Sequence, residues 1–140
     1  MEPPIGRHLY WIARLTQKAF NDALESAGSS LPAWLILLHV EKKKFDTQTE
    51  LASAIGIEGP TLTHHLDAME HDGLVKRVRD VDNRRAIKVE LTEAGREMFS
   101  RLHDVAIGFE EQLRTGVSDD EVAMVRSVLD RFGRNVSGQD

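Results

Sequence analysis

Apolar residues recur at spacings of three and four along the first part of the chain, which is the pattern of amphipathic helices. The pattern predicts a first helix over about 5–27, ended by Gly28. A second helix over about 31–44 is opened by Ser30 and Pro32. Each of these helices is expected to bury one apolar stripe.

Two further helices are predicted in the middle of the chain. Thr47 and Glu50 have the spacing of a capping box, which opens a short helix over about 48–54. Gly56 permits a sharp turn, and Pro60 is tolerated in the first turn of a helix that runs to about His71. Two helices joined by a tight turn have the outline of a helix-turn-helix.

The pattern then changes to β-prone runs, which flank the charged segment 80–84 and predict a two-stranded hairpin. Thr92 caps a helix over about 93–115, and a second capping box at Ser118 opens a last helix over about 119–134. The order α-α-α-α-β-β-α-α is mainly α with a small β-hairpin. It predicts a winged helix-turn-helix fold.

The length of 140 residues fits a single domain over 1–140. Within it we assign 30–92 to the winged helix-turn-helix part, and 1–28 and 93–140 to a helical dimerisation part. The first and last helices carry more apolar surface than a monomer buries, so we expect a homodimer. The residues expected at its seam are Leu9, Ile12, Val125, Leu129 and Phe132.

Composition excludes several classes of protein. Hydrophobic residues make up 41% and charged residues 29%, as in folded globular proteins. No apolar run approaches the roughly 20 residues of a membrane-spanning helix, and the N-terminus lacks the pattern of a secretion signal, so we expect a cytoplasmic protein without a membrane partner. The absence of cysteine excludes disulfides, thiolate nucleophiles and cysteine metal sites.

Positive charge is concentrated in the predicted hairpin, although the formal net charge of the chain is −5. The segment 76–88 contains six basic and two acidic residues. A basic segment on an otherwise acidic chain is a local site for a polyanion. Its charged residues are Lys76, Arg77, Arg79, Arg84, Arg85 and Lys88, with Asp80 and Asp82.

The helix that begins at Pro60 has an apolar face, which we expect to pack inward, and a small polar face that points outward. Such a face suits insertion into the DNA major groove, with the hairpin beside it contacting phosphates and the minor groove. An ordinary solvated face is the alternative. The expected DNA contacts are Pro60, Thr61, Thr63, His64, Arg77, Arg79, Arg84 and Arg85.

Arg84 and Arg85 at the hairpin tip carry the strongest signal for nucleic acid, because guanidinium groups remain charged and fit a narrow minor groove. One of them has an alternative structural role, in which it pairs with Asp80 or Asp82. Adjacent strand residues face opposite ways, so we expect one structural and one contacting arginine.

Aromatic and polar residues on the first two helices have two interpretations. They serve the core or a helix seam, or they line an apolar cleft with one cation that accepts a small aromatic carboxylate. The residues concerned are His8, Trp11, Arg14, Trp34 and His39.

Catalysis and metal binding are poorly supported. The serines lack the glycines of a nucleophile elbow, and there is no glycine-rich phosphate loop, so we expect no enzymatic activity and no cofactor. His64, Asp67 and His71 share one helix face, but two histidines seven residues apart are separated by about 10 Å along the axis. A metal sensor therefore remains only an alternative.

Four stretches of the sequence resemble the MarR family of winged helix-turn-helix regulators, and the SlyA branch in particular. They are QTELASAIGIEGPTL at 48–62, LDAMEHDGLV at 66–75, DNRRA at 82–86 and ELTEAG at 90–95. The resemblance extends over the whole chain. It implies a homodimeric transcription regulator, a repressor or an activator, that binds double-stranded DNA at a palindromic operator and is released by a salicylate-like aromatic anion.

Three positions depart from the family pattern. Asn83 replaces the usual wing aspartate, His64 stands where related proteins tend to carry arginine, and His39 is one position away from the pocket residue it would match. The resemblance leaves a second interpretation open, in which the Thr63 and His64 face of a winged-helix module binds a partner protein instead of DNA.

Overall fold

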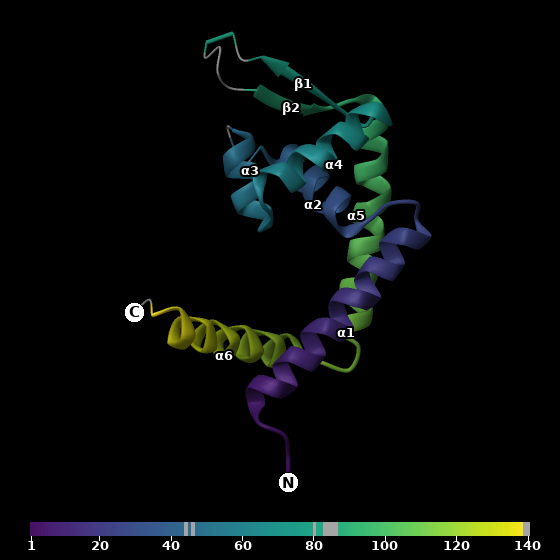
Figure 1. Cartoon of the computed structure of the whole chain (residues 1–140). Helices are drawn as coiled ribbons and strands as arrows, with labels where there is room; N and C mark the ends of the chain where they lie inside the picture. Colours follow the sequence, from purple (N-terminus) through teal and green to yellow (C-terminus); the bar gives the residue numbers. More distant parts are fainter. Residues whose placement is uncertain (44, 46, 80, 83–86, 139–140) are drawn as a thin grey trace. The chain divides into compact units, whose positions relative to one another are not determined.

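The computed structural model describes residues 1–43, 45, 47–79, 81–82 and 87–138 (Figure 1). Its helices and strands follow the predicted order. They are α1 (Ile5–Ser26), α2 (Leu31–Lys42), α3 (Gln48–Ile55), α4 (Gly59–His71), β1 (Val75–Arg79), β2 (Ile87–Leu91), α5 (Glu93–Leu113) and α6 (Asp119–Ser137). The prediction of a mainly helical fold with one hairpin is confirmed.

Side-chain caps set the beginnings of several helices. The Ser30 hydroxyl accepts a hydrogen bond from the Ala33 N–H (3.3 Å), and Thr92 caps α5 in the same way through the Gly95 N–H (3.0 Å). At α6 the capping box is complete, because Ser118 and Glu121 each accept from the other's backbone N–H.

Three helix ends differ from the prediction by two or more residues, among them α5, which ends at Leu113 rather than at 115. Helix α2 stops at Lys42 rather than at 44, because Lys43 adopts the left-handed conformation (φ 51°, ψ 43°) and its N–H returns to the Val40 carbonyl. Helix α6 continues to Ser137 before Gly138 ends it in the left-handed conformation. The end of α2 was not predicted, because nothing in the local sequence distinguishes a lysine that ends a helix from one that continues it. For α6 the available signal was Gly138, since glycine commonly ends helices in this conformation.

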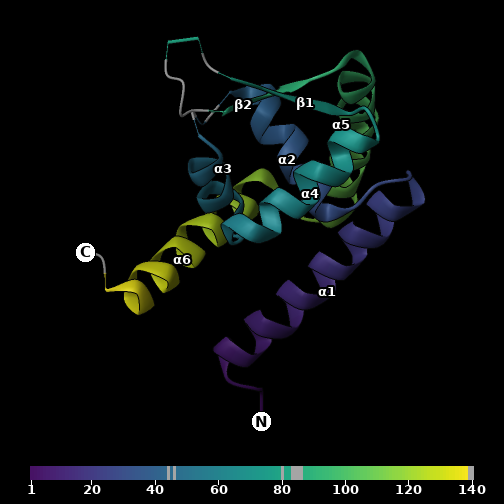
Figure 2. The ribbon, with the colours of Figure 1, turned by 45° about the horizontal axis from the view of Figure 1, so that its top comes forward.

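The chain forms two compact units, Met1–Ala106 and Ile107–Asp140, so α5 contributes to both. In the first unit α2, α3 and α4 contact one another, and the hairpin packs on them through contacts of α4 with β1 and of α2 and α3 with β2 (Figures 1 and 2). The fully buried side chains at the centre are Leu24, Ile36, Leu37, Leu51, Leu62, Leu66, Val75 and Leu102.

The hairpin is antiparallel, and Val75 pairs with Leu91 at its base. The first turn of α5 lies directly against this base. Thr92 donates its backbone N–H to the Leu74 carbonyl (3.1 Å) and its hydroxyl to the Gly73 carbonyl (2.6 Å). A Cβ at Gly95 would overlap the Leu74 carbonyl oxygen, so only glycine fits there. The base of the hairpin is therefore fixed to α5.

The second unit contains the end of α5 and the whole of α6. Helix α6 has no buried residue, although it is amphipathic. Its apolar side chains Met124, Val125, Leu129 and Val136 are all exposed. Across both units, no helix within the described residues has the length and apolar character that crossing a membrane requires.

Candidate nucleic-acid interface

Helix α4 presents the two faces that its sequence predicts. Leu62, Leu66 and Met69 are buried and anchor the helix in the core of the first unit. The opposite face is exposed and polar, because Pro60, Thr61, Thr63 and His64 all point to solvent. The structure therefore brings the four predicted α4 contacts onto one accessible surface.

The N-terminal end of α4 is open to an incoming acceptor. Glu58 occupies the N-cap but makes no side-chain cap, so the first backbone N–H groups have no side-chain partner among the residues that the structure describes. The Thr63 hydroxyl donates its hydrogen to the Gly59 carbonyl (3.1 Å), so toward a ligand it can act only as an acceptor. The His64 ring lies 5.8 Å from that of His65, and both carry N–H groups for hydrogen bonding. This end of the helix is rich in donors.

No lysine or arginine occurs in α4, whereas its exposed surface carries the carboxylates of Asp67 and Glu70. Both bind Arg77 of β1. The Arg77 guanidinium lies 2.5 Å from Asp67 Oδ1 and 3.0 Å from Glu70 Oε1, and the Arg77 backbone N–H donates to Glu70 Oε2 (3.0 Å). Three polar contacts thus join α4 to the first strand of the hairpin.

The electrostatics of this group follow from its hydrogen bonds. The guanidinium holds the pKa of Glu70 below its usual value, first through the side-chain hydrogen bond and then through the Arg77 N–H. The pKa of Arg77 is raised, chiefly by its hydrogen bond to Glu70. With 22% of its side chain exposed, Arg77 is the more buried partner. Asp67 and Glu70 already pair with the charge of Arg77, and in this respect Arg77 differs from the other predicted DNA contacts.

Of the hairpin arginines predicted to contact DNA, Arg79 is the one that is exposed within the described residues. It lies two residues after Arg77 on β1, so the strand's alternation places both on the same face, and Arg79 is exposed there. Lys76 lies on the other face, with its Nζ 3.6 Å from Glu90 of β2. The predicted tip contacts Arg84 and Arg85, with Asp80 as a suggested partner, lie outside the described residues.

Sequence reasoning missed the roles of Asp67 and Glu70. It assigned Arg77 to DNA and sought carboxylate partners for the arginines within the hairpin. The available signal was the i, i+3 spacing of two acidic residues on the helix that directly precedes the strand. That spacing places both carboxylates on one helix face, where a strand cation can reach them.

The five residues predicted for ligand binding have different environments. Trp34 is 5% exposed and stacks on Phe99 of α5, with ring centroids 5.6 Å apart, whereas Trp11 on α1 is 57% exposed. Arg14 contacts the hydroxyl and ring of Tyr10. His39 Nδ1 lies 2.7 Å from the Leu35 carbonyl oxygen, and His8 is exposed. In this chain Trp34 is part of the core.

Metal binding by α4 finds no support in the structure. No group of three histidine, aspartate or glutamate side chains in the described part of the chain could hold a metal ion. Asp67, the middle member of the proposed set with His64 and His71, is bound to Arg77 instead. The alternative of a metal sensor built on these residues therefore has no support among the described side chains.

An exposed polar helix, anchored in a helical core and flanked by a basic hairpin, defines the winged helix-turn-helix class of DNA-binding proteins. Comparison with known proteins gives the family. Residues 30–87 match the model of the MarR family, and the chain is 32% identical to the transcriptional regulator PA3341 over 96% of this chain and 99% of that one, with a TM-score of 0.82. The chain belongs to the MarR family, whose members are DNA-binding transcription regulators rather than enzymes. None of the matches distinguishes a SlyA branch.

Two further crystal structures with this fold contain bound molecules. The M. tuberculosis regulator MosR, in complex with DNA, is 26% identical, with a TM-score of 0.74 over 97% of this chain and 98% of that one. CouR from Rhodococcus jostii, bound to p-coumaroyl-CoA, is 23% identical, with a TM-score of 0.79 over 91% of this chain and 90% of that one.

Proposed function

We propose that this protein is a homodimeric regulator that binds a palindromic operator through α4 and the hairpin of each subunit. The observation that carries the proposal is the exposed face of Pro60, Thr61, Thr63 and His64 beside the accessible Arg79 on β1. Donors near the start of α4 suit base edges and nearby phosphates. A cationic hairpin suits the adjacent backbone and minor groove.

The tip arginines Arg84 and Arg85 complete the proposed contact set. They follow Arg79 in the same hairpin, where guanidinium groups suit a narrow minor groove. Arg77 acts differently in this proposal. Because Asp67 and Glu70 match its charge, it holds the hairpin against α4 and sets the angle between the two contacting elements.

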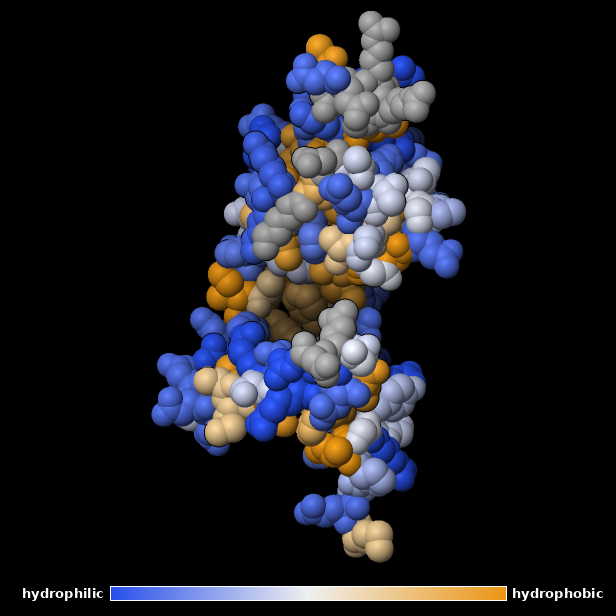
Figure 3. All heavy atoms as spheres, turned by 90° about the vertical axis from the view of Figure 1, so that its left-hand side faces the viewer, coloured by the Kyte–Doolittle hydropathy of each residue, from blue (hydrophilic) through white to orange (hydrophobic). Residues whose placement is uncertain are grey.

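Unpartnered apolar side chains support the homodimer. On α1, Ile5, Trp11, Ile12 and Leu15 are exposed, and on α6 the exposed set includes Val125 and Leu129. Figure 3 shows apolar residues, in orange, reaching the surface among the polar ones. Helices with such faces usually bury them against a partner. Leu9 and Phe132, both half-buried, extend the same two faces.

Selection of bound duplexes from a random DNA library tests the operator proposal. Recovery of a palindrome with half-sites about one helical turn apart is expected, because a two-fold dimer presents two equivalent α4 helices. Binding to that duplex should weaken steeply as salt rises, since several phosphate contacts release counterions. If the selection enriches no sequence and α4 instead captures a protein independently of salt, the chain is a protein-interaction module.

Release by a small anion is the regulatory part of the proposal. CouR, which shares the fold, was crystallised with an aromatic acyl-CoA. A ligand of this chain would lower DNA affinity only if it binds better to a conformation whose α4 helices no longer fit the groove. Titration of the protein–operator complex with small aromatic carboxylates tests this part separately from operator binding.

A further inference from the structure

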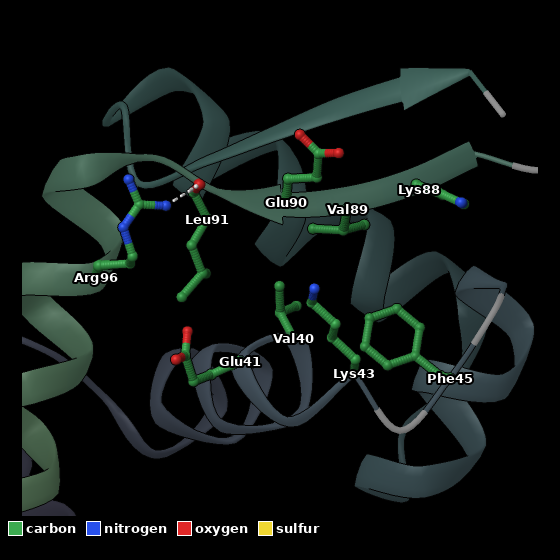
Figure 4. A pocket seen from close by; sticks show the side chains of 9 residues that line it. All are labelled: Val40, Glu41, Lys43, Phe45, Lys88, Val89, Glu90, Leu91 and Arg96. Carbon is green, nitrogen blue, oxygen red and sulfur yellow. Dashed lines mark hydrogen bonds between the residues drawn. The ribbon is translucent and has the colours of Figure 1, made fainter. Parts of the chain in front are cut away.

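A cavity of about 550 Å³ lies beneath the hairpin, and none of the five residues predicted to bind ligand lines it. Its lining comes from the end of α2, the following loop, β2 and the first turn of α5 (Figure 4). A volume of this size falls within the roughly 300–1,000 Å³ of small-molecule sites. The lining residues are Val40, Glu41, Lys43, Phe45, Lys88, Val89, Glu90, Leu91 and Arg96.

One wall of this cavity is apolar. Val89 and Leu91 point into it from β2 and Val40 from α2, while the Phe45 ring closes one side (Figure 4). The three aliphatic residues are buried and Phe45 is half-buried. These side chains provide a surface for the carbon skeleton of a compact ligand.

Three cations, Lys43, Lys88 and Arg96, line the cavity, and Lys88 already has an interaction partner of its own. The left-handed conformation of Lys43 ends α2, and its side chain extends toward β2 beside Val40 (Figure 4). Arg96 donates one guanidinium N–H to the Leu91 carbonyl (3.2 Å), which holds the group at the edge of the cavity with other N–H donors to spare. Neither Lys43 nor Arg96 has an ion pair within the described residues.

The acidic residues of the lining limit the charge that a ligand can carry. Glu90 is paired with Lys76 of β1, so its carboxylate is already matched. Glu41 has no ion pair in the described part of the chain and partly offsets Lys43 and Arg96. With Lys88 included, the lining carries three basic and two acidic residues, which leaves room for one negative charge rather than two.

We propose that this cavity binds a small organic monocarboxylate, with its carboxylate between Lys43 and Arg96 and its apolar body against Val40, Phe45 and Leu91. The regulatory consequence rests on the proposed function. Because β2 forms one wall while α2 and α5 form the other, a bound acid fixes the hairpin relative to the helical core. It therefore changes how the hairpin, and α4 joined to it through Arg77, reach DNA.

Calorimetric titration with benzoate tests the site directly, with benzamide as the uncharged analogue and phthalate as the dianion. Benzoate is expected to bind at millimolar concentration, and more tightly than either analogue. Lys43→Asn removes the charge while tolerating the left-handed backbone, and Arg96→Gln keeps an N–H donor for Leu91. Each is expected to weaken benzoate binding by about tenfold, the loss of one charge-assisted contact. Lys42→Asn, one position earlier and outside the lining, leaves binding unchanged.

Amide chemical shifts measured during the same titration locate the ligand, and changes are expected at Phe45, Leu91 and Arg96. Three outcomes would overturn the proposal. They are no binding of benzoate, binding by the Lys43 and Arg96 variants as tight as by the parent protein, and chemical-shift changes confined to Trp11 and Arg14 on α1. Operator affinity is measured separately with and without benzoate, and linkage requires a reciprocal change. If no operator is bound but benzoate still enters the cavity, the proposed function fails and the site stands.

Discussion

Glu70 accepts hydrogen bonds from both the backbone N–H and the guanidinium of Arg77, each at 3.0 Å. One carboxylate therefore fixes the strand backbone and the strand side chain to α4 together. Asp67, one helical turn earlier, binds the same guanidinium. The recognition helix and the hairpin form one connected element, and their relative angle depends on this group of three residues.

Arg77→Ala is expected to lower both the melting temperature and the operator affinity, because it leaves two carboxylates beside the proposed DNA surface without their cation. Arg77→Lys keeps the charge but loses the planar geometry that reaches both acids, so it should recover only part of either property. Thermal melts and fluorescence anisotropy on the selected operator measure the two effects. A variant with normal melting and normal affinity would show that the contacts do not set the hairpin angle.

Arg79→Ala is expected to act on DNA binding alone. Its side chain is exposed and has no ion pair within the described residues, so folding stability should be unchanged. Loss of one phosphate contact weakens binding by about 1–3 kcal/mol and reduces the slope of log affinity against log salt by about 1. Lys18→Ala, on α1 and paired with Asp22, is the matched control and should alter neither quantity.

Unfolding at acid pH should reveal the contribution of the Glu70 carboxylate to folding stability. Its pKa in the folded protein lies below the usual value of 4.5, so its stabilising effect is complete above that value. The effect is lost as the pH falls through the lowered pKa, because protonation breaks the pairing with Arg77. Urea unfolding from pH 7 down to pH 3 is therefore expected to show a smaller acid-induced loss in Glu70→Gln than in the parent protein. Identical pH profiles for the two proteins would contradict this role.

Gly95→Ala is expected to destabilise the protein by about 1–3 kcal/mol, the usual cost of overpacking. The added methyl group would overlap the Leu74 carbonyl oxygen, and a backbone atom cannot move aside as a flexible side chain can. Gly108→Ala on the same helix is the control, since nothing lies within 4 Å of its added Cβ. Chemical denaturation should show that the control is neutral or more stable, by up to about 1 kcal/mol from helix propensity.

Leu129→Asp tests the homodimer. The side chain is 43% exposed in the single chain, so the charge costs little for folding of one subunit but would be buried unpaired in a subunit seam. Light scattering at micromolar concentration should give a dimer mass for the parent protein and a monomer mass for the variant. Asp130→Ala, its polar neighbour, should remain a dimer. A monomeric parent protein would remove α6 from the proposed seam.

The sequence predicted element order well because caps and turn residues act locally. Ser30, Thr92 and Ser118 each accept the hydrogen bond from the N–H three residues later that their positions predicted. The apolar face of α4 was also predictable, since helical periodicity alone selects Leu62 and Leu66. Features that depend on local backbone chemistry thus follow from the sequence alone.

Features that depend on contacts between elements were not predictable in the same way. Arg77 looked like a DNA contact because its partners lie seven and ten positions earlier, on another element. Trp34 had two interpretations from the sequence, a core residue or a ligand contact, and its stacking partner Phe99 lies far along the chain. The cavity beneath the hairpin combines four segments that no single sequence motif unites.

The absence of lysine and arginine from α4 has a consequence for how the protein moves through a genome. Attraction to DNA of arbitrary sequence depends on phosphate neutralisation, and of α4 and the hairpin only the hairpin contains lysine or arginine. Away from its operator the protein should dissociate quickly, because α4 carries carboxylates and adds no cationic side chain to attract the DNA backbone. Few molecules are then sequestered on the vast excess of competing sites, so a small cellular pool is enough to occupy the operator.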